Sequence, residues 1–174
     1  MSTSSLSAVA AHHSAGRTRA RAFVITVSDT RSLADDRSGD RIAALLEAAG
    51  QSVAGREVVR DEARAIAERV ARAAGDAAVD LVLVTGGTGV APRDVTPEAI
   101  APLLDRRLDG FGELFRMLSF EEIGPAAMLS RACAGLIGAT PVFVLPGSTA
   151  AVEMALSRLI LPELGHLLAL AAPR

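Results

Sequence analysis

Residues 79–89 read VDLVLVTGGTG, an apolar run followed at once by a turn of three glycines and two threonines. The run Val79–Val84 is typical of a strand that is buried on both faces of a parallel sheet. The turn Thr85–Gly89 could bring backbone N–H groups close to an anion, because glycine places no Cβ in the way. The same residues would also suit an ordinary tight turn between packed elements. Their spacing matches neither the GxGxxG fingerprint nor the GxxxxGK[ST] phosphate loop.

Strand and helix patterns alternate on both sides of this run. Short segments rich in β-branched residues predict further strands at residues 22–27, 52–59, 132–137 and 142–145. Apolar residues at helical spacing predict helices over residues 39–49, 61–74, 111–120 and 148–159, with others that begin at 96 and 162. This order predicts an α/β fold, a three-layer doubly wound sheet whose strands are mostly parallel.

Four polar residues stand where these helices are expected to begin. Ser38, Asp61, Thr96 and Ser148 each precede a helical pattern, and an N-cap side chain accepts a hydrogen bond from the first turn. Pro97 follows Thr96, as is common in the first turn of a helix. For Asp61, capping alone would account for the residue. For Ser148, the alternative to capping is an anion held at the helix N-terminus.

Length and composition fit one domain. The chain has 174 residues, of which 50% are hydrophobic, and such a length is usual for a single core. Residues 1–20 are rich in Ser, Ala, His and Arg and predict a flexible leader, followed by one domain over residues 21–174. The leader has no apolar stretch of the kind that signal peptides carry, and no uninterrupted run is long enough to span a membrane. We therefore expect a cytoplasmic protein with no membrane partner.

All 18 basic residues are arginine, and the chain contains no lysine. Schiff-base chemistry on lysine and the lysine-containing phosphate loop are therefore excluded. The single cysteine, Cys133, excludes an internal disulfide and a thiolate-rich zinc site. A formal net charge of −2 gives no general attraction to nucleic acid, which is not expected as a partner. A bound phosphate would have to be held by arginine, backbone N–H groups, a helix N-terminus or a metal.

Polar residues follow each predicted parallel strand at its carboxyl end, where open α/β sheets bind their ligands. Ser28 and Asp29 follow the first strand, Asp61 the second, residues 85–94 the third and residues 146–148 the last. We therefore expect one polar, glycine-rich rim.

Two places on this rim offer charged groups. Asp94 lies just before an expected helix, and its carboxylate could hold Mg²⁺, a hard cation that prefers oxygen ligands. A local turn bond or an ion pair with an arginine is the alternative. Ser130 and Arg131 precede a predicted strand and provide a hydroxyl and a guanidinium, or simply a solvent-facing strand edge.

Four motifs occur in order along the chain. They are VSDT at 27–30, TGGTGVAPRDVTPEAI at 85–100, FRMLSFEEIGPAAMLSRA at 115–132 and LPGSTAAV at 145–152. Together they resemble the MoaB/Mog family of molybdenum cofactor biosynthesis proteins, over roughly residues 21–170. The resemblance implies the α/β fold described above with a small antiparallel extension of its sheet. FRMLSFEEIG and PGST resemble the MoaB branch, because Mog-type members carry different residues in both segments.

The resemblance implies an adenylyl transfer reaction. In it the terminal phosphate of molybdopterin attacks the α-phosphate of ATP, with Mg²⁺ required, ATP as co-substrate and no tightly bound cofactor. Such transfer depends mainly on positioning and charge stabilisation, so it needs no nucleophile–base pair in the protein. Asp61 and Asp94 match the two functional aspartates of the family, and Asp94 is the expected metal ligand.

The resemblance also implies a set of residues that bind the two substrates at the rim. In chain order they are Ser28, Asp29, Thr85, Gly86, Gly87, Thr88, Gly89, Ser130, Arg131, Pro146, Gly147 and Ser148. The glycine turn would hold phosphate through its N–H groups, and the serine–arginine pair would meet the pterin phosphate or the pyrophosphate. The last three residues would close the pocket.

Two further functions compete with this one. A non-catalytic pterin-binding or scaffolding oligomer would keep the same rim, and in some organisms the transferase activity belongs to a Mog-type protein. A nicotinamide- or flavin-binding protein is disfavoured because the GxGxxG spacing is absent. Members of the resembled family form trimers, and MoaB-type members also hexamers. The resemblance therefore implies a homotrimer or hexamer, with residues 111–118 as one contact face or, alternatively, as ordinary core.

Overall fold

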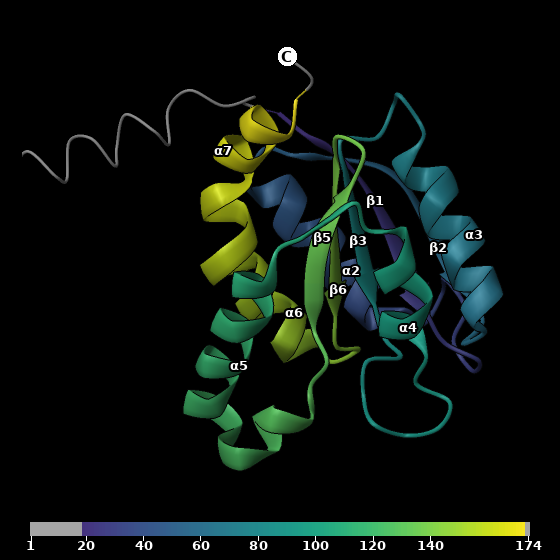
Figure 1. The fold of residues 1–174 in the computed structure, drawn as a ribbon, viewed down its shortest axis with the longest axis vertical. Coiled ribbons are helices and arrows are strands. Elements are labelled where there is room, and N and C mark those ends of the chain that lie inside the picture. Colours follow the sequence, from purple (N-terminus) through teal and green to yellow (C-terminus); the bar gives the residue numbers. More distant parts are fainter. Residues whose placement is uncertain (1–18, 173–174) are drawn as a thin grey trace, which may run out of the picture.

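The computed structural model describes residues 19–172, which form one mixed sheet between two layers of helices (Figure 1). The sheet of this region has six strands in the order β2-β1-β3-β6-β5-β4. Four of them are parallel: β1 (Arg21–Val27), β2 (Ser52–Val59), β3 (Leu81–Thr85) and β6 (Thr140–Leu145). The remaining strands form an antiparallel extension at the edge: β5 (Cys133–Ile137) pairs antiparallel with β6, and β4 (Arg106–Arg107) pairs antiparallel with β5. The predicted α/β sheet with an antiparallel extension is confirmed.

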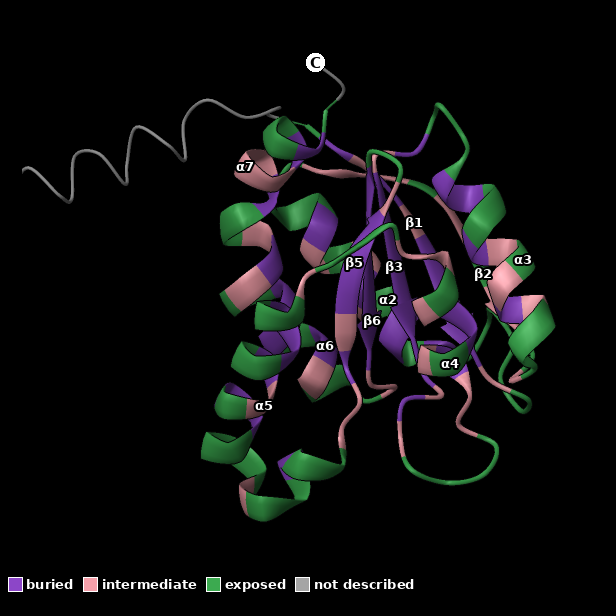
Figure 2. Ribbon diagram, viewed as in Figure 1, coloured by how far each residue is buried: buried purple, intermediate pink, exposed green. Residues whose placement is uncertain are grey.

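The apolar composition of β3 explains why this strand lies at the centre of the sheet. All five of its residues are buried, and it pairs with β1 on one side and β6 on the other. Since every backbone group of a buried strand needs a partner, such a strand is stable only with neighbours on both edges. Figure 2 shows the sheet as the buried centre of the molecule, with exposed residues on the outer faces of the helices.

Helices cover the two faces of the sheet unequally. One face is packed by α2 (Arg37–Ala48), α5 (Asp109–Ile123), α6 (Thr149–Ala155) and α7 (Leu161–Ala171). The other is packed by α3 (Ala63–Ala74) and the short α4 (Thr96–Ile100). Two 3-10 segments, Ala101–Leu103 and Gly124–Leu129, follow α4 and α5.

The start of α2 differs from the prediction. Asp36 caps the helix, and its carboxylate accepts the Gly39 N–H at 2.9 Å. Ser38 is buried inside the first turn, so its predicted N-cap role is wrong. Asp36 wins because tertiary partners hold it: Thr26 donates to it at 2.7 Å and Arg56 at 3.2 Å. A buried carboxylate is stable only when donors satisfy it, and Thr26, Gly39 and Arg56 all donate to Asp36.

Two of the other three predicted caps are also wrong. Helix α3 begins after Glu62, and Asp61 lies one residue outside the cap. Helix α4 begins after Val95, with Thr96 as its first residue. Neither helix has a side-chain cap, so local capping explains neither Asp61 nor Thr96. Ser148 does cap α6, and its hydroxyl accepts the Ala151 N–H at 3.2 Å.

The last two predicted helices are one. Helices α6 and α7 are continuous through a π-helical turn, Leu156–Ile160, so the break predicted before Pro162 is wrong. Proline has no N–H for the carbonyl four residues earlier, and a wider turn removes that requirement without ending the helix.

Among residues 19–172, this helix of residues 149–171 is the one segment long and apolar enough, by length and composition, to cross a membrane. Glu153, Arg158 and Glu163 interrupt it, in agreement with the expectation that no apolar run is uninterrupted over that length. Its buried residues, among them Val152 and Leu164, belong to the core on the α2/α5 face of the sheet. Core packing therefore accounts for part of its hydrophobicity, while Leu170 near its end is exposed.

The described region covers residues 21–172 of the predicted domain but only residues 19 and 20 of the predicted leader. Residues 1–18 of the predicted leader lie outside the described residues. Ala20, which the prediction places in the leader, is buried, and its N–H donates to the Gln51 side chain at 2.6 Å. Arg106 and Arg107 are exposed and form the edge strand β4.

We predict that Gly86→Ala destabilises the protein more than Gly50→Ala. Both glycines have positive φ, at +104° and +75°, so alanine costs about 1–2 kcal/mol at either position. A Cβ at Gly86 would also collide with the Val27 carbonyl, whereas nothing lies within 4 Å of one at Gly50. The free energy of unfolding, from denaturant titration, should fall by a further ~1–3 kcal/mol in Gly86→Ala. Equal losses in the two variants would contradict this close approach.

Candidate functional site

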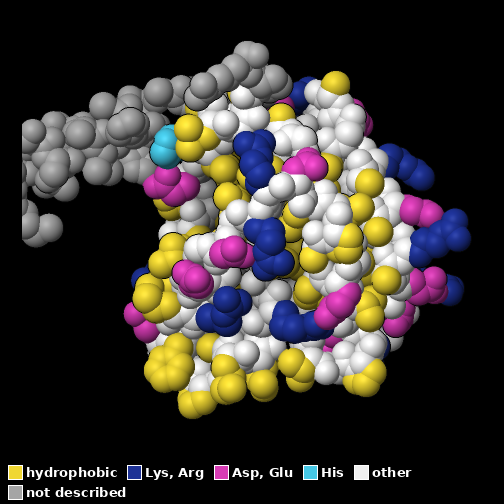
Figure 3. Space-filling model, in the orientation of Figure 1, with side chains coloured by type: hydrophobic (Ala, Val, Ile, Leu, Met, Phe, Trp, Pro, Cys, Tyr) yellow, Lys and Arg dark blue, Asp and Glu magenta, His cyan; other side chains and the backbone are white. Residues whose placement is uncertain are grey.

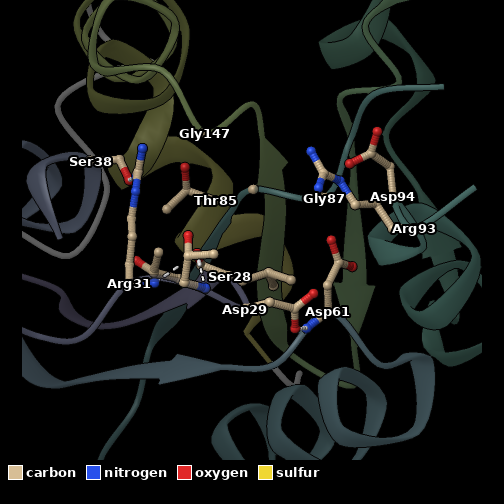
Figure 4. Close-up of a pocket in the computed structure, with 14 residues that line it drawn as sticks. Ser28, Asp29, Arg31, Ser38, Asp61, Thr85, Gly87, Arg93, Asp94 and Gly147 are labelled. Carbon is tan, nitrogen blue, oxygen red and sulfur yellow. Dashed lines mark hydrogen bonds between the residues drawn. The ribbon is translucent and has the colours of Figure 1, made fainter. Parts of the chain in front are cut away.

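A polar cavity of about 230 Å³ opens at the carboxyl ends of β1 and β3. In Figure 4, Arg31 and Ser38 stand on one side of it and Asp61, Arg93 and Asp94 on the other, with Thr85 and Ser28 between them. Other lining residues are Thr26, Val27, Asp29, Thr30, Gly86, Gly87 and Gly147. The rim expected from the strand order is therefore present as one cavity.

Ser28 and Asp29 are held in place by hydrogen bonds from backbone N–H groups. The Ser28 hydroxyl accepts the N–H groups of Thr30 and Arg31, at 3.3 and 3.2 Å. The Asp29 carboxylate accepts the N–H of Asp61 at 3.1 Å. Asp29 thus joins the end of β1 to the end of β2, and it fixes the backbone from which Asp61 projects.

The glycine turn is bound to β6 at its start. The Gly86 N–H donates to the Leu145 carbonyl at 3.0 Å, and the Thr85 hydroxyl donates to the Pro146 carbonyl at 2.8 Å. The Gly86 N–H is therefore not available to a phosphate, contrary to expectation. Gly87, with φ of +62°, lines the cavity, and its N–H has no acceptor among the described residues.

Asp61 in the cavity wall carries a carboxylate whose pKa is raised. Burial raises its pKa, and the negative charges of Asp94 and Asp29 raise it further, while a hydrogen bond from the Val95 N–H lowers it. Its Oδ1 is buried and has no hydrogen-bond partner among the described residues. A carboxylate that is costly to ionise and has an unused oxygen beside a cavity is typical of functional sites.

Asp94 faces the cavity while stabilising its own loop. Its Oδ2 accepts the Ala91 N–H at 3.0 Å, so the local turn bond considered as an alternative is present. Within residues 19–172, no group of three or more acidic, histidine or cysteine side chains is placed to hold a metal ion. Asp94 could therefore contribute one oxygen to a cation that takes its other ligands from a substrate and water, as Mg²⁺ commonly does.

Arg131 does not lie in the cavity wall. Its guanidinium donates to the Gly89 carbonyl at 2.8 Å, to the Asp94 carbonyl at 2.5 Å and to the Glu98 carboxylate. Its own N–H donates to the Thr88 carbonyl at 3.1 Å. These bonds clamp both ends of the loop that carries Asp94, so in this structure Arg131 supports the loop beside the cavity.

Of the remaining predicted site residues, some line the cavity and others hold neighbouring segments in place. Gly147 lines the cavity, Pro146 anchors Thr85 through its carbonyl, and Ser148 caps α6. Thr88 and Gly89 lie outside the wall of the 230 Å³ cavity.

Ser130 and Arg131 line a second groove of about 690 Å³. It runs between α4, α5 and the start of β5 and includes Arg107, Arg116 and Cys133. Figure 3 shows this face, with a row of basic side chains interspersed with acidic ones. Cys133 is partly buried, and this burial raises the pKa of its thiol.

Two cations of the cavity, Arg31 and Arg93, were not predicted from the sequence. Arg31 follows the VSDT motif directly, and Arg93 precedes Asp94, so proximity to those motifs could have indicated both. Ser38 was expected only as a cap, yet it lines the cavity and accepts from Arg31 at 3.3 Å.

Comparison with known proteins agrees with this geometry. The family model described as a probable molybdopterin binding domain matches residues 23–166. The chain belongs to the MoaB/Mog family of molybdenum cofactor biosynthesis proteins. It is 52% identical over 147 residues to molybdenum cofactor biosynthesis protein B of Bacillus subtilis, covering 84% of this chain and 86% of that protein.

Solved structures of the family share the fold. A molybdenum cofactor biosynthesis protein B superposes with a TM-score of 0.86 at 47% identity, covering 88% of this chain and 96% of the other. The Mog protein of Mycobacterium ulcerans gives a TM-score of 0.80 at 32% identity, covering 88% and 99%. Identity is higher to these two B-type members than to the Mog protein, in agreement with the resemblance of FRMLSFEEIG and PGST to the MoaB branch.

We predict that Asp61→Asn is more stable than the wild type at neutral pH. An aspartate whose pKa is raised in the folded state destabilises that state as pH rises from the usual aspartate range through the raised value. The Tm advantage of the variant should therefore grow over that interval and vanish in acid. Glu68→Gln is the control with the same charge change, and it should have the opposite sign, since the Arg64 hydrogen bond lowers the pKa of Glu68. Loss of stability in Asp61→Asn at neutral pH would contradict the assignment of burial as the dominant cause.

Proposed function

We infer that the chain acts in molybdenum cofactor biosynthesis, and we propose that it catalyses the Mg²⁺- and ATP-dependent adenylylation of molybdopterin. The observation that supports this most strongly is the single cavity that gathers Asp61, Asp94, the turn at Gly87 and two arginines at the strand ends. It contains side chains suited to phosphate and a cation. None of the lining residues is a histidine, cysteine or lysine of the kind that covalent transfer usually employs.

The proposed reaction exchanges one phosphoanhydride bond for another. A terminal phosphate oxygen of molybdopterin attacks the α-phosphorus of ATP, the bond from that phosphorus to the β-phosphate bridging oxygen breaks, and pyrophosphate leaves. The attacking group is already an anion, so no side chain has to remove a proton. The protein's task is to align the two phosphates and to offset their charge.

The arginines and the glycine turn perform that task in this proposal. Arg31 and Arg93 stand on opposite sides of the cavity, where two guanidinium groups can bind phosphate oxygens by paired hydrogen bonds (Figure 4). The Gly87 N–H supplies a further donor. Loop geometry is kept by Arg131, whose clamp on the Gly89 and Asp94 carbonyls is already formed.

The charge of the cavity wall fits a bound cation. Asp29, Asp61 and Asp94 face two arginines, so the wall carries one more negative than positive group. A triphosphate would be repelled by this wall unless a cation accompanied it. Asp94 would contribute the free oxygen of its carboxylate, and Asp61 Oδ1 is a second unused oxygen. Mg²⁺ bound there would neutralise charge that develops on the phosphates.

A non-catalytic pterin-binding or scaffolding role is the second candidate. The higher identity to protein B members than to a Mog protein favours considering it, because the branch that carries the activity differs among organisms. Molybdopterin is the proposed ligand in either case, and the cytoplasm the proposed location.

A homotrimer or hexamer is the proposed assembly. Large apolar side chains of α5 and the 3-10 segment after it are exposed: Met117, Phe120, Ile123, Met128 and Leu129. Apolar atoms crowd the lower edge of the face in Figure 3. A concentration of this kind marks an interaction surface more often than a free one. The expected face of residues 111–118 is divided, since Phe111, Phe115 and Leu118 are core and Leu114 is half exposed.

We predict that purified protein converts molybdopterin and ATP with Mg²⁺ to adenylylated molybdopterin and pyrophosphate, and that Asp94→Asn reduces the rate at least about 100-fold. Glu68→Gln on the outer face of α3 is the charge-matched control and should retain wild-type turnover. Products would be followed by chromatography and a pyrophosphate assay. Pterin binding without product in the wild type would reject the transferase in favour of the second candidate, and wild-type turnover in Asp94→Asn would reject the metal assignment.

We predict a solution mass of three or six chains by light scattering at micromolar concentration. Phe120→Ser combined with Met128→Ser should shift the mass toward smaller species while circular dichroism stays unchanged, because both side chains are exposed within one chain. Glu68→Gln should leave the mass unaltered. A monomeric wild type would contradict the proposed assembly.

A further inference from the structure

Thr96 is a buried residue beside the cavity whose hydroxyl has no assigned role. The residue is fully buried at the start of α4, and its N–H donates to the Gly87 carbonyl at 3.1 Å. The predicted capping role would have used the hydroxyl, but α4 begins after Val95 without a side-chain cap. Thr96 Oγ1 has no hydrogen-bond partner among the described residues. A buried hydroxyl without a partner destabilises the fold, so this one calls for a physical explanation.

Asp61 supplies the matching feature. Its Oδ1 is likewise buried without a partner among the described residues, and both oxygens lie within 3.0 Å of the position that a Cβ on Gly87 would take. A Cβ at Gly87 would collide with Thr96 Oγ1 and would lie 3.0 Å from Asp61 Oδ1. A carboxylate can only accept hydrogen bonds, whereas a hydroxyl can donate one, so the two groups are chemically complementary. Gly87 leaves open the space between them.

We propose that Thr96 is a positioning residue of the site, whose hydroxyl donates to Asp61 Oδ1 directly or through one water held beside Gly87. A water in such a place needs polar partners on either side, and these two oxygens supply them. The bond would fix the rotamer of Asp61. Together with the Thr96 N–H bond to Gly87, it would make the first residue of α4 the common support of the carboxylate and the glycine turn.

The consequence for the proposed reaction concerns Asp61 alone. Without the hydroxyl, the carboxylate would be free to rotate in the cavity, and misplacement of a reacting or charge-stabilising group by about 1 Å can cost about 100-fold in rate. This part of the inference rests on the proposed function. The pairing of the two side chains does not, because it alters stability whatever the reaction is.

A double-mutant cycle measures the pairing. Thr96→Val removes the hydroxyl at nearly constant shape, and it is made in the wild type and in Asp61→Ala. We expect a lower denaturant midpoint on Thr96→Val in the wild type, and an unchanged or higher midpoint in the Asp61→Ala background, where the hydroxyl has lost its partner. Thr140→Val is the matched control, since its hydroxyl donates to the Ala74 carbonyl at 2.9 Å, and it should cost the same in both backgrounds. Equal effects of Thr96→Val in the two backgrounds would overturn the proposal.

Turnover gives a second readout. Thr96→Val should lower kcat by about 10- to 100-fold with little change in KM for ATP, and Thr96→Ser, which keeps the hydroxyl, should restore most of it. Wild-type kcat in Thr96→Val would overturn the positioning role. Coupling in the stability cycle with no adenylylation by the wild type would support the pair and reject the proposed function, so the two failures are distinguishable.

Discussion

The close approach of Gly86 to the Val27 carbonyl is the constraint on which the cavity depends. It brings the carboxyl ends of β1 and β3 together with no side chain between them. Bonds from Gly86 and Thr85 then tie the same turn to Leu145 and Pro146 at the end of β6. Three strand ends thus form one rigid floor, and the polar residues that follow them can only lie above it.

Arginine side chains add a second set of hydrogen bonds that hold the segments around the cavity in place. The guanidinium is planar and carries five donors, so one side chain can hold several acceptors in fixed directions. Arg131 uses this to join the antiparallel edge of the sheet to the loop of residues 89–94, while Arg56 bridges Asp36 and Asp40 behind the cavity. Lysine, a point charge on a flexible stem, would not supply such clamps equally well. The all-arginine composition, which first excluded lysine chemistry, therefore also bears on how the site is supported.

The roles of the site residues depend on which of their hydrogen-bonding groups already have partners within the protein. The Ser28 hydroxyl accepts two backbone N–H groups, and the Thr85 hydroxyl and the Gly86 N–H both donate within the protein. Asp61 Oδ1, Thr96 Oγ1 and the Gly87 N–H have no partner within residues 19–172. Since buried polar groups are normally paired, the unpaired ones mark where the molecule is completed by something else or by a small rearrangement. They converge around one glycine of the turn.

The layers of the fold, the edge of the sheet on which the site lies and most of the residues near it could be predicted from the sequence. This was possible because β-branched runs, glycine turns and strand order act locally or follow from chain connectivity. The role of each residue, in contrast, was set by tertiary contacts. Asp36 displaced Ser38 as a cap because Thr26 and Arg56 donate to it from β1 and β2. Asp61 and Thr96 lost their predicted capping roles, and Arg131 became a clamp, because their neighbours come from segments distant along the chain. Hydrogen-bond partners across such distances leave no periodic signal in the sequence, and burial, which sets the pKa of Asp61, is a property of the packed molecule alone.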